Sequence, residues 1–117
     1  MSEKKQANQI NFDYNGKHYC LEYNRETVLA MEQAGYKPGQ TGDTPMVELN
    51  MLWAGAFRMH HSEGADRVSP RRIEEILNEV TMDKLELLDI LREMIAETYT
   101  TLMKGNDQGN VKLTVIR

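Results

Sequence analysis

Apolar and polar residues alternate in two short runs between residues 10 and 23, and Asn15-Gly16 separates the runs. A period of two is typical of strands with one buried face. Asn-Gly tolerates the positive φ angles of a two-residue type I′ turn, so the pattern predicts an N-terminal β-hairpin. Because an isolated hairpin is only marginally stable in water, its apolar face should pack on helices. The expected core residues of the hairpin are Phe12, Tyr14, Tyr19, Leu21 and Tyr23.

A short helix is predicted directly after the hairpin. Asn24 is a good N-cap, since its side-chain oxygen can accept a hydrogen bond from the first helical turn. Residues 25–34 place Val28 and Met31 on one face, which should turn inward. Gly35 is suited to the left-handed position that ends a helix.

Two further helices are expected over residues 46–60 and 70–80, because Thr44-Pro45 and Ser69-Pro70 each combine an N-cap with a proline at the first helical position. The first contains MLWAGAF and is apolar nearly all round, which favours central burial. The alternative is that one side packs in the domain and the other meets a partner. In the first helix one face should hold Met46, Leu49, Trp53, Ala56, Phe57 and His60, with His60 at the core margin. In the second helix the inward residues should be Ile73, Ile76, Leu77 and Val80.

The longest amphipathic pattern runs from Thr81 to Lys104, with Thr81 as the expected N-cap and Asp83 in the first turn. Its apolar arc covers nearly half of the circumference, which is wider than one neighbouring element needs. The arc therefore predicts contact with both the core and a partner. It contains Leu85, Leu88, Leu91, Ile95, Tyr99, Leu102 and Met103, opposite Glu86, Asp89, Glu93 and Glu97.

Apolar residues at the margins of these two long helices are the candidates for partner contact. Methionine suits adaptable binding surfaces, and small residues let another backbone approach closely. We expect such a surface to bind an amphipathic helix. Serine or glutamate in place of the two candidates on the last helix should spare the fold and weaken binding. The candidate residues are Val47, Met51, Ala54, Gly55, Ile90 and Met94.

The predicted fold class is α+β and mainly α, with the hairpin packed on about four helices. The length of 117 residues fits one domain, 1–117. Residues 1–8 should be flexible and 9–104 should form the core. Residues 105–117 contain a short alternation at Val111, Leu113 and Val115, which predicts either a third strand or a flexible tail.

The charge and the absence of long apolar runs favour a cytoplasmic protein. The net charge is −4, and no run approaches the roughly 18 apolar residues of a membrane span. A single cysteine, Cys20, cannot form an internal disulfide.

Candidate chemistry is sparse. His18 and Cys20 lie two apart, and His60 and His61 are adjacent. A structural zinc site needs four ligands, usually in paired short-spaced motifs, and adjacent helical histidines point about 100° apart. Cysteine with histidine could form a nucleophile and a base, but no orienting third group is recognisable. We therefore predict no metal, no cofactor and no enzymatic activity.

Nucleic-acid binding is the alternative reading of the last two predicted helices, which could form a helix-turn-helix pair. Between Glu74 and Glu97, however, acidic residues outnumber basic residues by eight to two, and phosphates would repel such a surface. The basic residues nearby could instead form a local patch that pairs with the acidic helix within the same domain. These residues are Arg58, Arg67, Arg71 and Arg72.

Residues 9 to 115 resemble the small tail assembly chaperones of long-tailed phages and prophages of Gram-positive bacteria. The segments that carry the resemblance are NFDYNGKHYCLEYNRETV, WAGAFRMHH and the closing GNVKL. The order of elements, from the Asn15-Gly16 hairpin to the acidic helical pair, is also similar.

The resemblance implies a non-enzymatic protein of the host bacterial cytoplasm. Its partners would be the tape measure protein, which is long, helical and prone to aggregate, and the tail tube protein, whose polymerisation it would promote. The resemblance offers no catalytic residues. Two alternatives are a small DNA-binding regulator of a mobile element and a minor structural tail protein. A homo-oligomer is left open.

Overall fold

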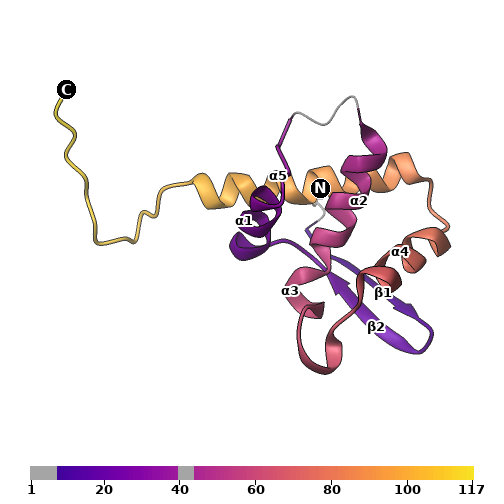
Figure 1. The fold of residues 1–117 in the computed structure, drawn as a ribbon. Coiled ribbons are helices and arrows are strands. Elements are labelled where there is room, and N and C mark those ends of the chain that lie inside the picture. Colours follow the sequence, from indigo (N-terminus) through magenta and orange to yellow (C-terminus); the bar gives the residue numbers. More distant parts are fainter. Residues whose placement is uncertain (1–7, 40–43) are drawn as a thin grey trace, which may run out of the picture.

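The computed structural model describes residues 8–39 and 44–117, and over these residues the chain is α+β and mainly α, as predicted (Figure 1). Of the predicted flexible segment 1–8, all but Asn8 lies outside the described residues. No helix in the described part of the chain is long and apolar enough to span a membrane. The elements are β1 (Ile10–Tyr14), β2 (Lys17–Leu21), α1 (Arg25–Gln33), α2 (Pro45–Ala56), α3 (Arg58–His61), the 3₁₀ turn η1 (Gly64–Asp66), α4 (Pro70–Glu79) and α5 (Lys84–Met103).

The predicted hairpin is confirmed. β1 and β2 pair antiparallel, with Phe12 opposite Tyr19. Asn15 and Gly16 have φ angles of 50° and 81°, which is the left-handed backbone that a type I′ turn requires. The ring of Phe12 stacks on that of Tyr19 with 5.1 Å between centroids, so the aromatic face of the hairpin turns toward the helices.

The start of α1 is also as predicted. Asn24 Oδ1 accepts a hydrogen bond from the Thr27 backbone N–H at 2.8 Å, and Thr27 Oγ1 accepts one from the Asn24 N–H at 2.7 Å. This reciprocal capping box satisfies two backbone donors at once. Gly35 follows the helix with a φ of 109°, so the chain leaves α1 through a left-handed residue.

Helix α2 is the central helix, and its predicted burial is confirmed. Trp53 is buried, its ring lies 6.2 Å from that of Phe12, and its indole N–H donates to the Ile73 carbonyl at 2.9 Å. Trp53 thus joins the hairpin, α2 and α4. Met46, which was expected to share a face with Trp53, is 66% exposed, because the start of α2 extends beyond the core.

The expected single helix over residues 46–60 is wrong at its C-terminal end. α2 ends at Ala56, where the Phe57 N–H bonds to the Ala54 carbonyl, and α3 begins at Arg58. This bond to the third residue back is tighter than an α-helical bond and interrupts the helix. His61 is buried and His60 is exposed, whereas the sequence placed His60 on the face of Trp53 at the core margin.

Helix α5 crosses the other elements and extends past α1 (Figure 1). Asp83, not Thr81, is its N-cap residue. Three residues of the predicted apolar arc, Leu85, Leu102 and Met103, are exposed, because the two ends of α5 extend beyond the packed part of the domain. The core instead buries Leu87, Leu88, Leu91, Met94 and Ile95.

Of the two alternatives left open for the C-terminus, a third strand or a flexible tail, the third strand is not formed among the described residues. Among the described residues the sheet has two strands, and residues 105–117 are exposed throughout. Figure 1 shows this segment leading away from the end of α5 without folding back on the hairpin. We call residues 111–116 the C-terminal segment below.

Candidate functional site

The six residues predicted for partner contact do not form one surface. Val47 is 53% exposed and Ala54 is exposed, while Met51 and Ile90 are half-buried against the core. Gly55 and Met94 are buried.

Gly55 and Met94 therefore require a correction. A Cβ atom added at Gly55 would lie 2.4 Å from Met31 Sδ, so this glycine admits the side chain of α1 and not another protein. Met94 is 1% exposed and belongs to the centre of the core. Neither residue offers surface to a partner in this structure.

Ile90 borders an apolar groove of about 400 Å³, which we call the β1 groove. One wall is β1, and the other consists of the end of α4, the α4–α5 connection and the first turns of α5. The lining is mainly apolar, with Asp13 and Glu79 as its charged residues. Its apolar side chains include Ile10, Phe12, Val80, Met82, Leu87 and Ile90.

The two outer edges of the hairpin differ. Tyr14 and Lys17 flank the two-residue turn, so they form a hydrogen-bonded pair. Hydrogen-bonded and non-hydrogen-bonded pairs alternate along the strands, so the N–H and C=O groups of Asn11 and Asp13 on β1 point away from β2. On β2, the Cys20 N–H donates to His61 Nε2 at 3.1 Å and the Glu22 N–H donates to the Ala56 carbonyl at 3.1 Å.

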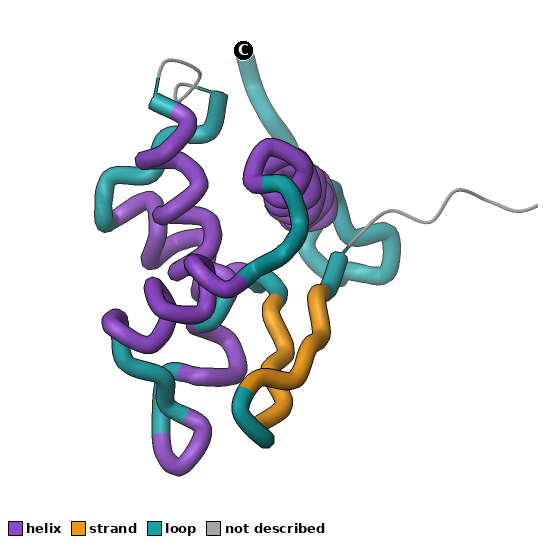
Figure 2. The backbone as a smooth tube through the Cα atoms, turned by 90° about the vertical axis from the view of Figure 1, so that its right-hand side faces the viewer, coloured by secondary structure: helices purple, strands orange, loops and turns teal. Residues whose placement is uncertain are grey.

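No such cover exists on β1 within the described part of the chain, where the backbone N–H groups of Asn11 and Asp13 have no hydrogen-bond partner. In Figure 2 most of the helices lie on one side of the two strands. The groove therefore runs beside an open strand edge, the arrangement to which an added strand can bind.

His61 fixes the covered edge of β2. Its Nε2 accepts from Cys20, and its Nδ1 lies 3.1 Å from the Asp66 carbonyl oxygen. A carbonyl can only accept, so the proton must reside on Nδ1 and the ring is the neutral tautomer. The sequence pattern drew attention to His61 only as a neighbour of His60, and nothing in it indicated a partner 41 residues away.

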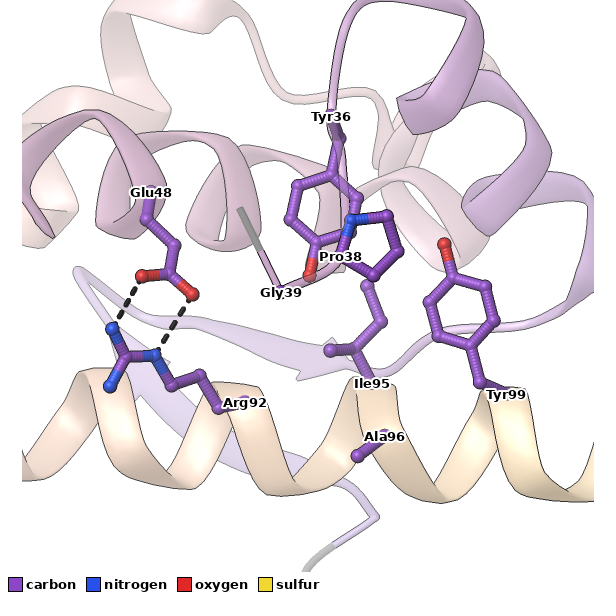
Figure 3. A pocket seen from close by; sticks show the side chains of 8 residues that line it. All are labelled: Tyr36, Pro38, Gly39, Glu48, Arg92, Ile95, Ala96 and Tyr99. Carbon is purple, nitrogen blue, oxygen red and sulfur yellow. Dashed lines mark hydrogen bonds and ion pairs between the residues drawn. The ribbon is translucent and has the colours of Figure 1, made fainter. Parts of the chain in front are cut away.

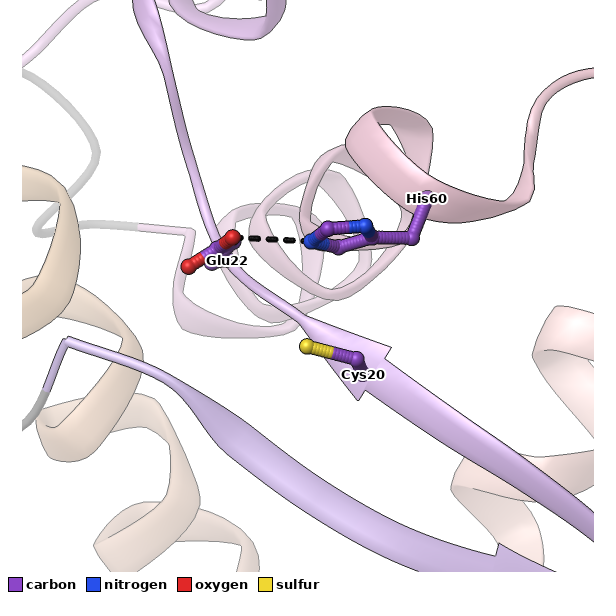
Figure 4. A group of neighbouring side chains, drawn as sticks. All are labelled: Cys20, Glu22 and His60. Atoms are coloured by element: carbon purple, nitrogen blue, oxygen red, sulfur yellow. Dashed lines mark hydrogen bonds and ion pairs between the residues drawn. The ribbon is translucent and has the colours of Figure 1, made fainter.

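Cys20, Glu22 and His60 form a cluster at the end of β2 that the sequence analysis missed (Figure 4). One ligand atom from each residue lies within 4.8 Å of the other two. Thiolate, carboxylate and imidazole are all zinc ligands, so the three could hold a divalent cation with a fourth position open. The cation would have to displace the thiol proton and the 2.8 Å contact between His60 Nε2 and Glu22 Oε2.

The same surroundings make Cys20 a poor nucleophile. Burial and the adjacent Glu22 carboxylate raise the pKa of the Cys20 thiol. Because the thiolate is the reactive form, a higher pKa leaves less of it at neutral pH.

We expect iodoacetamide at neutral pH to alkylate Cys20 more slowly in the folded protein than in the urea-unfolded chain. The rate in the folded protein should rise as the pH approaches and passes the raised pKa. Mass spectrometry of timed samples measures both rates. A folded-state rate equal to or above that of the unfolded chain would contradict the expectation.

A second pocket lies between α2 and α5 (Figure 3). At its edge the buried Glu48 carboxylate accepts two hydrogen bonds from Arg92, from Nε at 2.9 Å and from Nη2 at 2.6 Å. Burial and the nearby Glu48 raise the pKa of Tyr36, and burial followed by the hydrogen bond to Glu32 raises that of Tyr99. Both phenols stay protonated at neutral pH, so the pocket presents a neutralised carboxylate and hydroxyl groups.

The predicted pairing of the nearby arginines with the acidic long helix is wrong for two of them. Arg71 and Arg72 approach Glu75 of their own helix, at 3.7 and 3.5 Å. Neighbouring turns of one helix bring i, i+3 and i, i+4 residues together without any tertiary contact. On the acidic face of α5, Asp89 lies 3.6 Å from Arg92 of the same helix.

These features define a small, mainly helical α+β domain whose distinctive surface is an apolar groove beside an open strand edge. The chain belongs to the family described as "Domain of unknown function (DUF5055)", whose model matches residues 1–116. The comparisons with curated proteins and with solved structures give no match.

Proposed function

We propose that this protein is a non-enzymatic tail assembly chaperone of a phage or prophage. It binds an amphipathic helical segment of the tape measure protein in the host cytoplasm and promotes polymerisation of the tail tube protein. The observation that carries the proposal is the β1 groove, an apolar recess on a domain with a net charge of −4. The resemblance of residues 9 to 115 to this class of chaperone supports it.

The groove matches what such a client needs. Phe12, Val80 and Ile90 offer apolar contact, and Met82 adds a flexible side chain that can adapt to different shapes. Apolar side chains of an amphipathic helix gain free energy when they leave water for such a recess. The acidic face of α5 remains available to keep the complex in solution.

Co-expression with a tape measure fragment tests the function. We expect the chain to raise the soluble fraction of the fragment and to co-elute with it in size-exclusion chromatography. Met82→Glu should weaken the complex by about tenfold or more, since it places a carboxylate against the apolar client.

Met103→Glu is the matched control, because Met103 is 81% exposed at the far end of α5 and does not line the groove. It makes the same chemical change and should leave binding unchanged. Separate elution of chain and fragment, with no gain in solubility, would refute the proposed function. Equal weakening by both variants would refute the groove as the site.

A further inference from the structure

We propose that the C-terminal segment of one copy of this chain adds as a third strand to the open edge of β1 in a second copy, and inserts its apolar side chains into the β1 groove. The proposal uses the groove of the proposed function but requires no client. The occupant of the groove in the isolated protein is then a second copy.

The open edge supplies the acceptor for this strand. The backbone N–H and C=O groups of Asn11 and Asp13 point away from β2. Within the described residues these two N–H groups have no hydrogen-bond acceptor. Beside β2, His61 and the Ala56 carbonyl already accept from the N–H groups of Cys20 and Glu22, so within the described residues the β1 edge is the more open of the two. An added strand would satisfy the unpaired groups of β1.

The C-terminal segment has the pattern of a strand with one apolar face. Val111, Leu113 and Val115 alternate with Lys112 and Thr114. All three apolar side chains are exposed, Val111 at 83%, and Figure 1 shows the segment leading away from the end of α5. Burying these side chains is favourable, and an alternating strand beside an apolar groove buries all three at once.

The charges of the two surfaces are complementary. Lys112 and Arg117 are the charged residues of the last seven positions, and both are basic. The charged residues of the groove, Asp13 and Glu79, are acidic. Pairing across the edge therefore brings opposite charges together, which favours this strand over an acidic one.

The geometry favours insertion of the C-terminal segment into the β1 groove of a second copy over insertion into the groove of its own chain. Ile90 lies 13 residues before Met103, about 20 Å back along α5. Residues 104–110 span at most about 24 Å when fully extended. They contain a turn, however, in which the Gly109 N–H bonds to the Asn106 carbonyl at 2.9 Å and the Gln108 N–H to Asn106 Oδ1 at 2.9 Å. This turn shortens the link, so the segment points outward, and two copies can exchange segments about a two-fold axis.

Sedimentation velocity of the full chain without any client tests the exchange. We expect a dimer whose dissociation constant rises by about tenfold or more when Val111, Leu113 and Val115 are all changed to Asp. The matched control changes Asn106, Gln108 and Asn110 to Asp, which adds the same three charges in the link and should keep the dimer. Lys112→Glu should weaken the dimer, and Asp13→Lys in the same chain should restore it, because Lys112 and Asp13 lie on the same face of the extended sheet.

Hydrogen exchange locates the contact. The amides of Asn11 and Asp13 should be protected in the dimer and exposed in the triple Asp variant of the C-terminal segment. A wild-type chain that stays monomeric would overturn the inference, whether or not its C-terminal segment is protected. A dimer that survives the triple Asp change would overturn it as well.

The outcomes separate this inference from the proposed function. The triple Asp variant should still bind the tape measure fragment, whereas Met82→Glu should lose both the client and the dimer. A dimer with no client binding rejects only the proposed function. Client binding by a chain that is always monomeric rejects only the strand exchange.

Discussion

Met94→Glu is expected to prevent folding of the domain, whereas Ile90→Glu should leave it folded. Met94 is 1% exposed and is among the largest fully buried side chains, together with Leu21 and Leu91. An ionised carboxylate at that position would lose its hydration without gaining a partner, at a cost of at least about 5 kcal/mol. This is comparable to the whole stability of a small domain. Ile90 is half-buried at the groove, where water can reach an introduced carboxylate.

Circular dichroism and urea denaturation of both variants measure this difference. Met94→Leu serves as the conservative control and should cost less than about 1.5 kcal/mol, since it keeps an apolar side chain of similar volume. Ile90→Glu should unfold near the wild-type midpoint and lose the client. A cooperative, near-native unfolding transition for Met94→Glu would contradict the buried position of this residue.

Arg92→Ala is expected to lower the free energy of unfolding by about 2–4 kcal/mol, because it leaves the buried Glu48 carboxylate without its bidentate donor. Arg71→Ala removes an arginine from an exposed contact at 3.7 Å and should change stability by less than about 0.5 kcal/mol.

Replacing both Glu48 and Arg92 distinguishes two effects of the single substitution. One is the loss of the attraction between the two charges, and the other is the cost of keeping the Glu48 carboxylate buried without Arg92. Glu48→Leu combined with Arg92→Leu should be more stable than Arg92→Leu alone, since the double variant keeps no buried carboxylate that has lost the Arg92 guanidinium. Urea denaturation of the single and double variants gives the coupling free energy. If Arg92→Ala and Arg71→Ala have equal effects, the Glu48–Arg92 pair contributes no more than a surface contact.

Much of the local structure could be predicted from the sequence, because its causes lie within a few residues of each other. Asn15-Gly16 specifies the hairpin turn through its backbone preferences. Asn24 caps α1 through Thr27, and Ser69 caps α4 through a hydrogen bond to the Arg72 N–H. The hairpin, the cap of α1 and the cap-plus-proline start of α4 were therefore predicted correctly.

Helix faces were predicted less well. The periodicity of the sequence gives the apolar arc of a helix, but it does not show which part of that arc other elements pack against. α5 has a wide arc, and its neighbours bury the part centred on Leu91 while both ends remain exposed. This is why Met94 was expected at a partner surface and is in the core. Gly55 was misassigned for the same reason, because only the packing of α1 on α2 places Met31 against it.

The candidate sites depend on residues that are far apart in the sequence. Glu48 and Arg92 are 44 positions apart, and Glu22 and His60 are 38 apart. The β1 groove combines residues 10–14 with residues 76–90. Spacing along the chain carries no information about such contacts. The sequence by itself determined the hairpin, the starts of α1 and α4, the acidic surface and the apolar alternation of the C-terminal segment. Only the tertiary structure decided which apolar residues are buried, which strand edge is open and which side chains share a site, because each of these depends on how distant elements pack.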